Sequence, residues 1–333
     1  MSRVRIVVLA VLLMICKLNM AEASTLSVAG EYLYFKPIIN GYYALPHSIV
    51  IPVQGTRLAA HYDFSSGYRV EGIYSFFCEQ VSARFRWSSL RASHKSSTSG
   101  IFVEFVNIPD FAPNTPFTNV NAQDSLTFDY DACDALVGWR FCERMVRAAL
   151  CLGVHYIKIS NEQMDTYSGT LLGLGPPRPL TVSVLWSTEA RGIGPELALF
   201  GEYLLPKIGC LPRIELLGSL QVGALVVNNE IDNKNSVTVE PLSPASPISI
   251  RVFAFNFTND EIQRIIPFWD LRLGLGSNVC LGPVIADISL GYEIVAYYDL
   301  LDRVILEGFL GPTFDFYNDL YLHGLFVRLG VSY

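Results

Sequence analysis

The segment LFVRLGVSY (residues 325–333) decides the fold, because its side chains alternate between two kinds of surface. Leu325, Val327, Leu329, Val331 and Tyr333 share one face, whereas Gly324, Arg328, Gly330 and Ser332 share the other, where Phe326 interrupts the polar row. Successive side chains of a β-strand point to opposite faces, so the segment reads as a strand with one apolar and one polar side. Such two-sided strands are typical of membrane-spanning β-barrels.

The same alternation recurs upstream and predicts an antiparallel, up-and-down barrel. Alternating segments lie at 67–77, 80–92, 133–141, 146–160, 195–206, 213–230, 267–278 and 283–299, and an opening strand at 28–37 has no clear face. Short connections at 77–80, 142–145, 207–212 and 279–283 alternate with long ones at 38–56, 94–123, 161–180, 231–265 and 300–319. The pattern gives an all-β transmembrane barrel of about ten strands with both ends on the short-turn side. A further strand is possible at 247–258, so a barrel of twelve strands remains the alternative.

The first residues have the pattern of a cleaved signal peptide. Arg3 and Arg5 precede the apolar run 6–16, and small residues flank Glu22, so cleavage is expected after Ala23. This assigns residues 1–23 to a signal peptide and 24–333 to one outer-membrane barrel domain. A retained membrane anchor is the alternative, but the run is short of the roughly 20 residues that a spanning helix needs. A lipoprotein is disfavoured because bulky residues precede Cys16.

The composition excludes several other classes of protein. The 333 residues are 51% hydrophobic, yet no stretch of eighteen apolar residues follows the signal segment, so helical spans are not expected. Charged residues make up only 17%, the net charge is −7, and no basic cluster suggests a nucleic acid partner. A secreted soluble β-sandwich is the alternative, but the polar rows carry charges of both signs along strand after strand. These features favour the bacterial outer membrane, with its lipid as the contacting partner.

The polar rows would line the lumen of the barrel. The charged residues expected there are Arg69, Glu71, Arg84, Arg86, Arg140, Glu196, Glu202, Arg213, Glu215, Asp270, Arg272, Asp287, Glu293 and Arg328, together with Glu31 and Arg147. Opposed charges in a channel tune which solutes pass, whereas in a narrow barrel they pair and fill the interior. About eight strands leave room only for side chains or one small ligand, so ten strands predict a narrow or occluded pore.

Four short stretches resemble a family of pore-forming outer-membrane proteins found in Legionella and in chlamydiae of environmental hosts. They are GEYLYFKP (30–37), GIGPEL (192–197), WDLRLGL (269–275) and the closing segment 325–333. The chain has more cysteines and fewer tryptophans than that family's pattern, so a chlamydial-type major outer-membrane protein is the closer picture. The resemblance implies a barrel that conducts small solutes, and it supplies no catalytic residue. The terminal Tyr333 is similar to the aromatic end by which such barrels are recognised by the barrel assembly machinery.

Six cysteines follow the signal segment, and four of them fall in the predicted short turns: Cys78, Cys142, Cys210 and Cys280. In an exported protein this pattern favours disulfides at the periplasmic rim, within the chain, between copies, or to other cysteine-rich envelope proteins as in chlamydial envelopes. Free cysteines are the alternative. No pair of cysteines has the spacing of a zinc knuckle with a nearby histidine, so no metal site is expected.

No motif of an enzyme occurs in the chain, and no cofactor is expected. His155 would face the lumen, where an outer-membrane hydrolase could use it, but a lumen-lining role is the simpler interpretation. Two functional hypotheses therefore remain ahead of an enzyme. The first is a porin-like barrel that passes small hydrophilic molecules or ions by diffusion. The second is a non-conducting surface protein or envelope component that carries long outer loops or disulfide links.

Overall fold

The computed structural model describes residues 25–39, 42–47, 58–59, 61–76, 80–100, 102–105, 117–143, 145–171, 178–206, 214–239, 250–306 and 313–333. The proposed signal peptide lies outside these residues. No helix in the described part of the chain has the length and apolar content of a membrane span.

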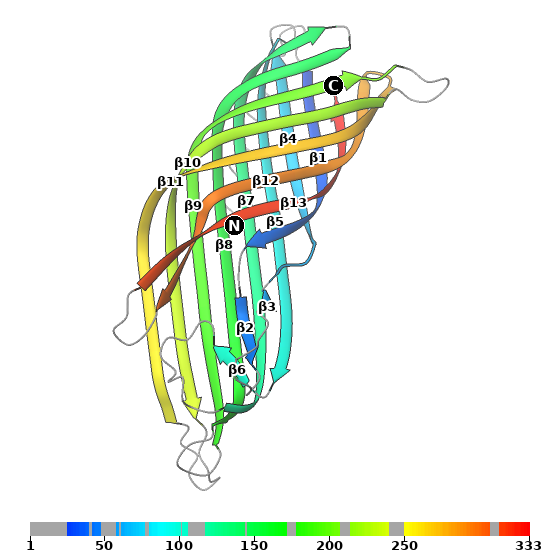
Figure 1. Cartoon of the computed structure of the whole chain (residues 1–333). Helices are drawn as coiled ribbons and strands as arrows, with labels where there is room; N and C mark the ends of the chain where they lie inside the picture. Colours follow the sequence, from blue (N-terminus) through cyan, green and yellow to red (C-terminus); the bar gives the residue numbers. More distant parts are fainter. Residues whose placement is uncertain are drawn as a thin grey trace.

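The described residues form strands that run in chain order around a tilted barrel (Figure 1). Their bounds are β1 Thr25–Ile39, β2 Tyr42–His47, β3 Leu58–Ala59, β4 Ser65–Phe76, β5 Val81–Gly100, β6 Phe102–Phe105, β7 Phe117–Glu143, β8 Val146–Leu171, β9 Arg178–Leu204, β10 Ile214–Val239, β11 Ile250–Leu281, β12 Val284–Leu306 and β13 Thr313–Ser332.

The described strands include a closed ring in the order β1-β13-β12-β11-β10-β9-β8-β7-β5-β4, with every neighbouring pair antiparallel. The prediction of an up-and-down barrel of ten strands is therefore confirmed. The alternative of twelve barrel strands is wrong, because residues 250–258 belong to the same strand as 267–278. The short β2, β3 and β6 form a separate three-stranded sheet, which lies toward the end of the barrel away from the short turns (Figure 1).

The described strand ends that flank the predicted short turns lie at one end of the barrel, as predicted. One of these turns joins β11 to β12 through Gly282 and Pro283, and Gly282 has the positive φ of 70° that a residue without a Cβ adopts easily. At the same end, β1 and β13 close the ring. The backbone of Leu26 exchanges two hydrogen bonds of 3.0 Å with that of Tyr333, which leaves no free edge at this seam.

Where the structure describes the segments predicted as long loops, most of their residues are in strands instead. β7 and β8 continue their pairing out to Phe117 and Leu171, and β10 and β11 pair out to Val239 and Ile250. The sequence there is rich in Asn, Ser and Asp, which pointed to loops. These residues form strands because neighbouring extended segments satisfy one another's backbone hydrogen bonds, whatever the polarity of the side chains.

The outer face of the barrel shows where the membrane ends. On β8 the outward side chains are apolar from Val146 to Tyr156, a length that matches the 9–11 residues of a membrane-crossing strand. Tyr156 is paired with Ile193 on β9, and the next outward pair is Lys158 and Arg191. The remaining fifteen residues of β8 therefore extend beyond the apolar band, over roughly 50 Å of strand.

Candidate functional site

The lumen is the candidate site, and the structure places the predicted charged residues there. Buried on the inner face are Glu31, Arg69, Glu71, Arg86, Glu196, Glu215, Asp270 and Glu293. Arg84, Arg140, Glu202, Arg272, Asp287 and Arg328 have inward positions and are half-buried. Arg147 also has an inward position but is exposed near the short-turn end. Arg213 lies outside the described residues.

A first ion-pair cluster lies around Arg328 of β13. Its guanidinium is 3.0 Å from Glu71 on β4 and 3.7 Å from Asp287 on β12. Glu71 also pairs with Arg84 on β5 at 3.2 Å. Because these residues come from four different strands, the cluster joins neighbouring parts of the wall through the interior.

A second group centres on Arg69 of β4, whose side chain is 3% exposed. It donates two hydrogen bonds, of 2.6 and 2.5 Å, to the carboxylate of Glu293 on β12. It donates a third to Glu31 at 3.1 Å and a fourth to the hydroxyl of Ser88 at 2.7 Å. A bidentate arginine–carboxylate pair of this kind is among the strongest polar contacts in proteins. This part of the lumen is therefore occupied by ordered side chains.

Arg86 of β5 makes contacts across the lumen. It pairs with Asp134 on the adjacent β7 at 2.5 Å and lies 3.3 Å from Asp270 on β11. It also donates a hydrogen bond to the side-chain amide oxygen of Gln221 on β10. β10 and β11 stand on the opposite part of the ring, so this one guanidinium bridges the interior.

His155 belongs to a chain of hydrogen bonds that leads out of this network. Its Nδ1 contacts Asp134, and its Nε2 is 2.9 Å from the hydroxyl of Tyr297, which is 3.0 Å from the hydroxyl of Tyr130. The imidazole stacks on Phe268, with 4.4 Å between ring centroids. The sequence placed His155 correctly in the lumen. It did not reveal the two tyrosines, which come from strands far apart in the chain.

An apolar layer follows the polar one toward the long-strand end, and sequence reasoning missed it. It includes Leu33, Phe35, Leu90, Phe128, Ile157, Leu225, Ile266, Phe268, Val295 and Leu322, all buried on the inner face. A signal was present, because inner rows change from polar to apolar at matching places, as from Glu31 to Leu33 and from His155 to Ile157. At those places both faces of a strand become apolar, which accounts for the unclear face of the first strand.

The segment that precedes β4 adds a side chain to this layer. Tyr62 is buried, packs against Phe128 with 5.7 Å between ring centroids, and donates a 2.5 Å hydrogen bond to Asn161 of β8. Phe64, only two residues later, lies on the outer side and stacks on Tyr34 of β1 at 5.2 Å. Along the chain, this segment therefore passes from the interior at Tyr62 to the outer face at Phe64, at the lip of the barrel where β4 begins.

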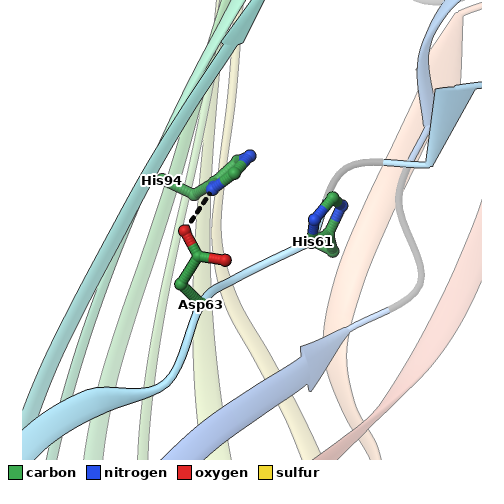
Figure 2. A group of neighbouring side chains, drawn as sticks. All are labelled: His61, Asp63 and His94. Atoms are coloured by element: carbon green, nitrogen blue, oxygen red, sulfur yellow. Dashed lines mark hydrogen bonds and ion pairs between the residues drawn. The ribbon is translucent and has the colours of Figure 1, made fainter.

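The same segment brings three potential metal ligands together, His61, Asp63 and His94 (Figure 2). The Oδ2 of Asp63 lies 2.8 Å from the Nδ1 of His94 on β5, and the ring of His61 is 4.7 Å from that of His94. The hydrogen bond to His94, aided by the nearby charges of His94, His61 and Lys36, lowers the pKa of the Asp63 carboxyl below its usual value. Sequence spacing had not grouped these residues.

The cysteines are only partly described. Cys142 and Cys280 lie at the short-turn ends of β7 and β11, as predicted, and both are free and exposed. A bond between these two is excluded in this structure, where β8, β9 and β10 separate their strands. Cys78 and Cys210 lie outside the described residues, so rim disulfides to partners stay a prediction.

A closed ring of antiparallel strands, an apolar outer band and a charged interior define a porin-like β-barrel protein of the outer membrane. More specifically, the model of the family described as Legionella pneumophila major outer membrane protein precursor matches residues 20–333. The chain belongs to this family and is a bacterial outer-membrane protein. The resemblance noted in the four stretches of sequence is thereby confirmed.

Comparison with solved structures finds other outer-membrane proteins at low identity. The outer membrane protease OmpT from Escherichia coli has 9% identity and a TM-score of 0.44, with 95% of this chain and 99% of that chain covered. A Pseudomonas aeruginosa FadL homologue has 6% identity and a TM-score of 0.28, with 94% and 90% covered. No protein of curated function matches the chain. We draw no functional conclusion from these likenesses.

Proposed function

We propose that the protein is a narrow, gated porin-like channel for small hydrophilic ions, and that it is not an enzyme. The observation that carries this proposal is the transverse contact of Arg86, which ties β5 to β10 and β11 through the middle of the lumen. Ten strands enclose little more than their own side chains. The arrangement described here is the closed state of the channel, and ions pass when side chains of the two layers move aside.

The charge of the lumen supports a preference for cations. The inner face carries the arginines Arg69, Arg84, Arg86, Arg140, Arg147, Arg272 and Arg328 and the carboxylates Glu31, Glu71, Asp134, Glu196, Glu202, Glu215, Asp270, Asp287 and Glu293. Carboxylates outnumber guanidiniums, and Glu196 is buried without a hydrogen-bond partner for either oxygen. Rings of acidic side chains favour cations in channels.

Tyr62 offers the sharpest test, because its side chain fills part of the lumen although the residue itself belongs to no strand of the barrel. Tyr62→Ala should remove an aromatic plug while the ladder of wall strands stays intact. In planar bilayers we expect the wild type to give rare, small current steps, and the variant to give longer or larger ones. In a KCl gradient the reversal potential should indicate preference for K⁺.

Phe64→Ala is the matched control, since it removes an aromatic ring from the same segment on the outer side. It should leave the current steps as in the wild type. A folded barrel that stays silent in both the wild type and Tyr62→Ala would contradict the channel. Folding is checked by the change of gel mobility on heating.

A second candidate function, display at the cell surface, is favoured by the strands that continue far past the apolar band. β7 to β11 would hold a polar, β-structured wall above the membrane. Limited proteolysis of intact cells tests this role. Cleavage confined to connections such as 172–177 and 240–249 would support display, and full protection of these connections would contradict it.

A further inference from the structure

We propose that His61, Asp63 and His94 form a binding site for a late first-row divalent metal ion, with Zn²⁺ as the expected ligand. The site lies where the segment before β4 meets β5 (Figure 2), and none of its three residues takes part in the ion pairs of Arg69, Arg86 or Arg328. It does not depend on whether the barrel conducts.

The strand register explains why these residues meet. β4 and β5 pair Gly67 with Leu90. Continuing the same antiparallel register past the end of the ladder brings Asp63 opposite His94. His61 precedes Asp63 by two positions in the same segment, and its ring lies 4.7 Å from the ring of His94. A His-x-Asp segment and a cross-strand histidine thus converge.

The donor atoms suit Zn²⁺ in number, type and separation. Two imidazole nitrogens and one carboxylate oxygen are typical ligands of Zn²⁺, and three protein ligands leave one position for water. One ligand atom from each residue lies within 4.8 Å of the others. Around a tetrahedral ion with bonds of about 2.0–2.1 Å, such atoms stand about 3.3 Å apart. Small side-chain movements would therefore close the site.

The surroundings allow an ion to enter and be held. The Asp63 side chain is 66% exposed and that of His94 only 15%, so one side of the group is open to solvent and the other rests on the wall. The carboxylate of Asp63 already accepts a hydrogen bond from the Nδ1 of His94 at 2.8 Å. A metal ion that replaces the proton between these two side chains would still be attracted by the negative charge of the carboxylate. Lys36 is the nearby cation that opposes binding.

Tyr62 lies between two of the proposed ligands in the chain, which gives binding a structural consequence. An ion that joins residues 61 and 63 to β5 would fix the backbone on both sides of Tyr62. That side chain would then be held against Phe128 and Asn161 in the apolar layer.

The test uses the full-length barrel without a polyhistidine tag, refolded in detergent, and competition with a chromophoric Zn²⁺ indicator. We expect one tight Zn²⁺ site per chain. His94→Asn and His61→Asn should each weaken it at least about tenfold, because even an outer-shell partner of a metal ligand is worth 10–100-fold. His323→Asn is the control, since it removes an imidazole that is not one of the three ligands and instead contacts Tyr292 and packs edge-on against Phe64.

Cu²⁺ gives a second readout that reports the ligands themselves. The electron paramagnetic resonance spectrum should show coupling to two imidazole nitrogens in the wild type and in His323→Asn, and to one in each site variant. Absence of Zn²⁺ binding by the folded wild type would overturn the proposal. Wild-type affinity in His94→Asn or in His61→Asn would overturn it as well, as would loss of the site in the folded control.

Discussion

Arg86 on β5 donates a hydrogen bond to Gln221 on β10, although β7, β8 and β9 stand between these strands along the wall. The contact crosses the barrel through a layer in which the guanidinium is almost fully buried. A charge in such a place is stable only because Asp134 and Asp270 neutralise it.

Removing this arginine should cost much stability. Arg86→Met keeps most of the side-chain length but leaves Asp134 and Asp270 without their shared cation, which should lower the free energy of unfolding by about 3–5 kcal/mol. Urea unfolding from lipid vesicles measures the change. The control is Arg91→Met on the same strand, because Arg91 is 71% exposed in its pair with Asp129 and should matter by less than about 1 kcal/mol. If Arg86→Met and Arg91→Met lowered the free energy of unfolding equally, the burial of Arg86 would be contradicted.

The position of the membrane border can be tested on the outer face of β8. Leu152 lies within the apolar band and is 67% exposed, so Leu152→Arg should place a charge in hydrocarbon at a cost of about 2–4 kcal/mol. Ser160 points outward beyond the band, and Ser160→Arg should cost about 0–1 kcal/mol. Folding efficiency and unfolding free energy in vesicles report the difference. If Ser160→Arg also lowered the free energy of unfolding by several kcal/mol, the membrane border would have to lie farther out than Tyr156.

Two glycines of the barrel wall differ in the space that an added side chain would find, so their substitutions should have different effects. A Cβ at Gly291 would collide with the backbone oxygen of Leu273 and with the ring of Phe326, so Gly291→Ala should destabilise the barrel by about 1–3 kcal/mol. A Cβ at Gly30 meets nothing within 4 Å, and Gly30→Ala should be neutral or slightly stabilising. Thermal shift of the heat-modifiable band compares them. The prediction fails if Gly30→Ala is the more harmful.

The free cysteines should differ in their reactivity. Cys142 and Cys280 are exposed at the short-turn end, so a small maleimide should label both in the folded protein in detergent. Cys151 is buried and should react only after unfolding. In cells, disulfide-linked species on non-reducing gels that disappear in Cys142→Ser and Cys280→Ser would support rim links to partners. Free monomer alone would rule those links out.

Alternation by itself determined the class of fold and the inner or outer position of most strand residues. In strands such as 325–333 the membrane demands an apolar outer row, and the period of two then forces Arg328 inward. The ring of ten strands and the inward arginines and carboxylates follow from that constraint. The prediction of loops from polar composition was wrong where strands extend beyond the membrane, because there the outer face does not need apolar side chains.

Only the tertiary structure decided which inward residues meet. Closure of the ring sets the strand register and tilt, and these place Arg86 beside Gln221, and His155 beside Tyr297, at separations of more than a hundred residues. The register of β4 against β5, continued into the segment before β4, brings Asp63 beside His94. The sequence contains each side chain and its face, but contacts across a lumen depend on how a closed sheet folds back on itself, which no local pattern encodes.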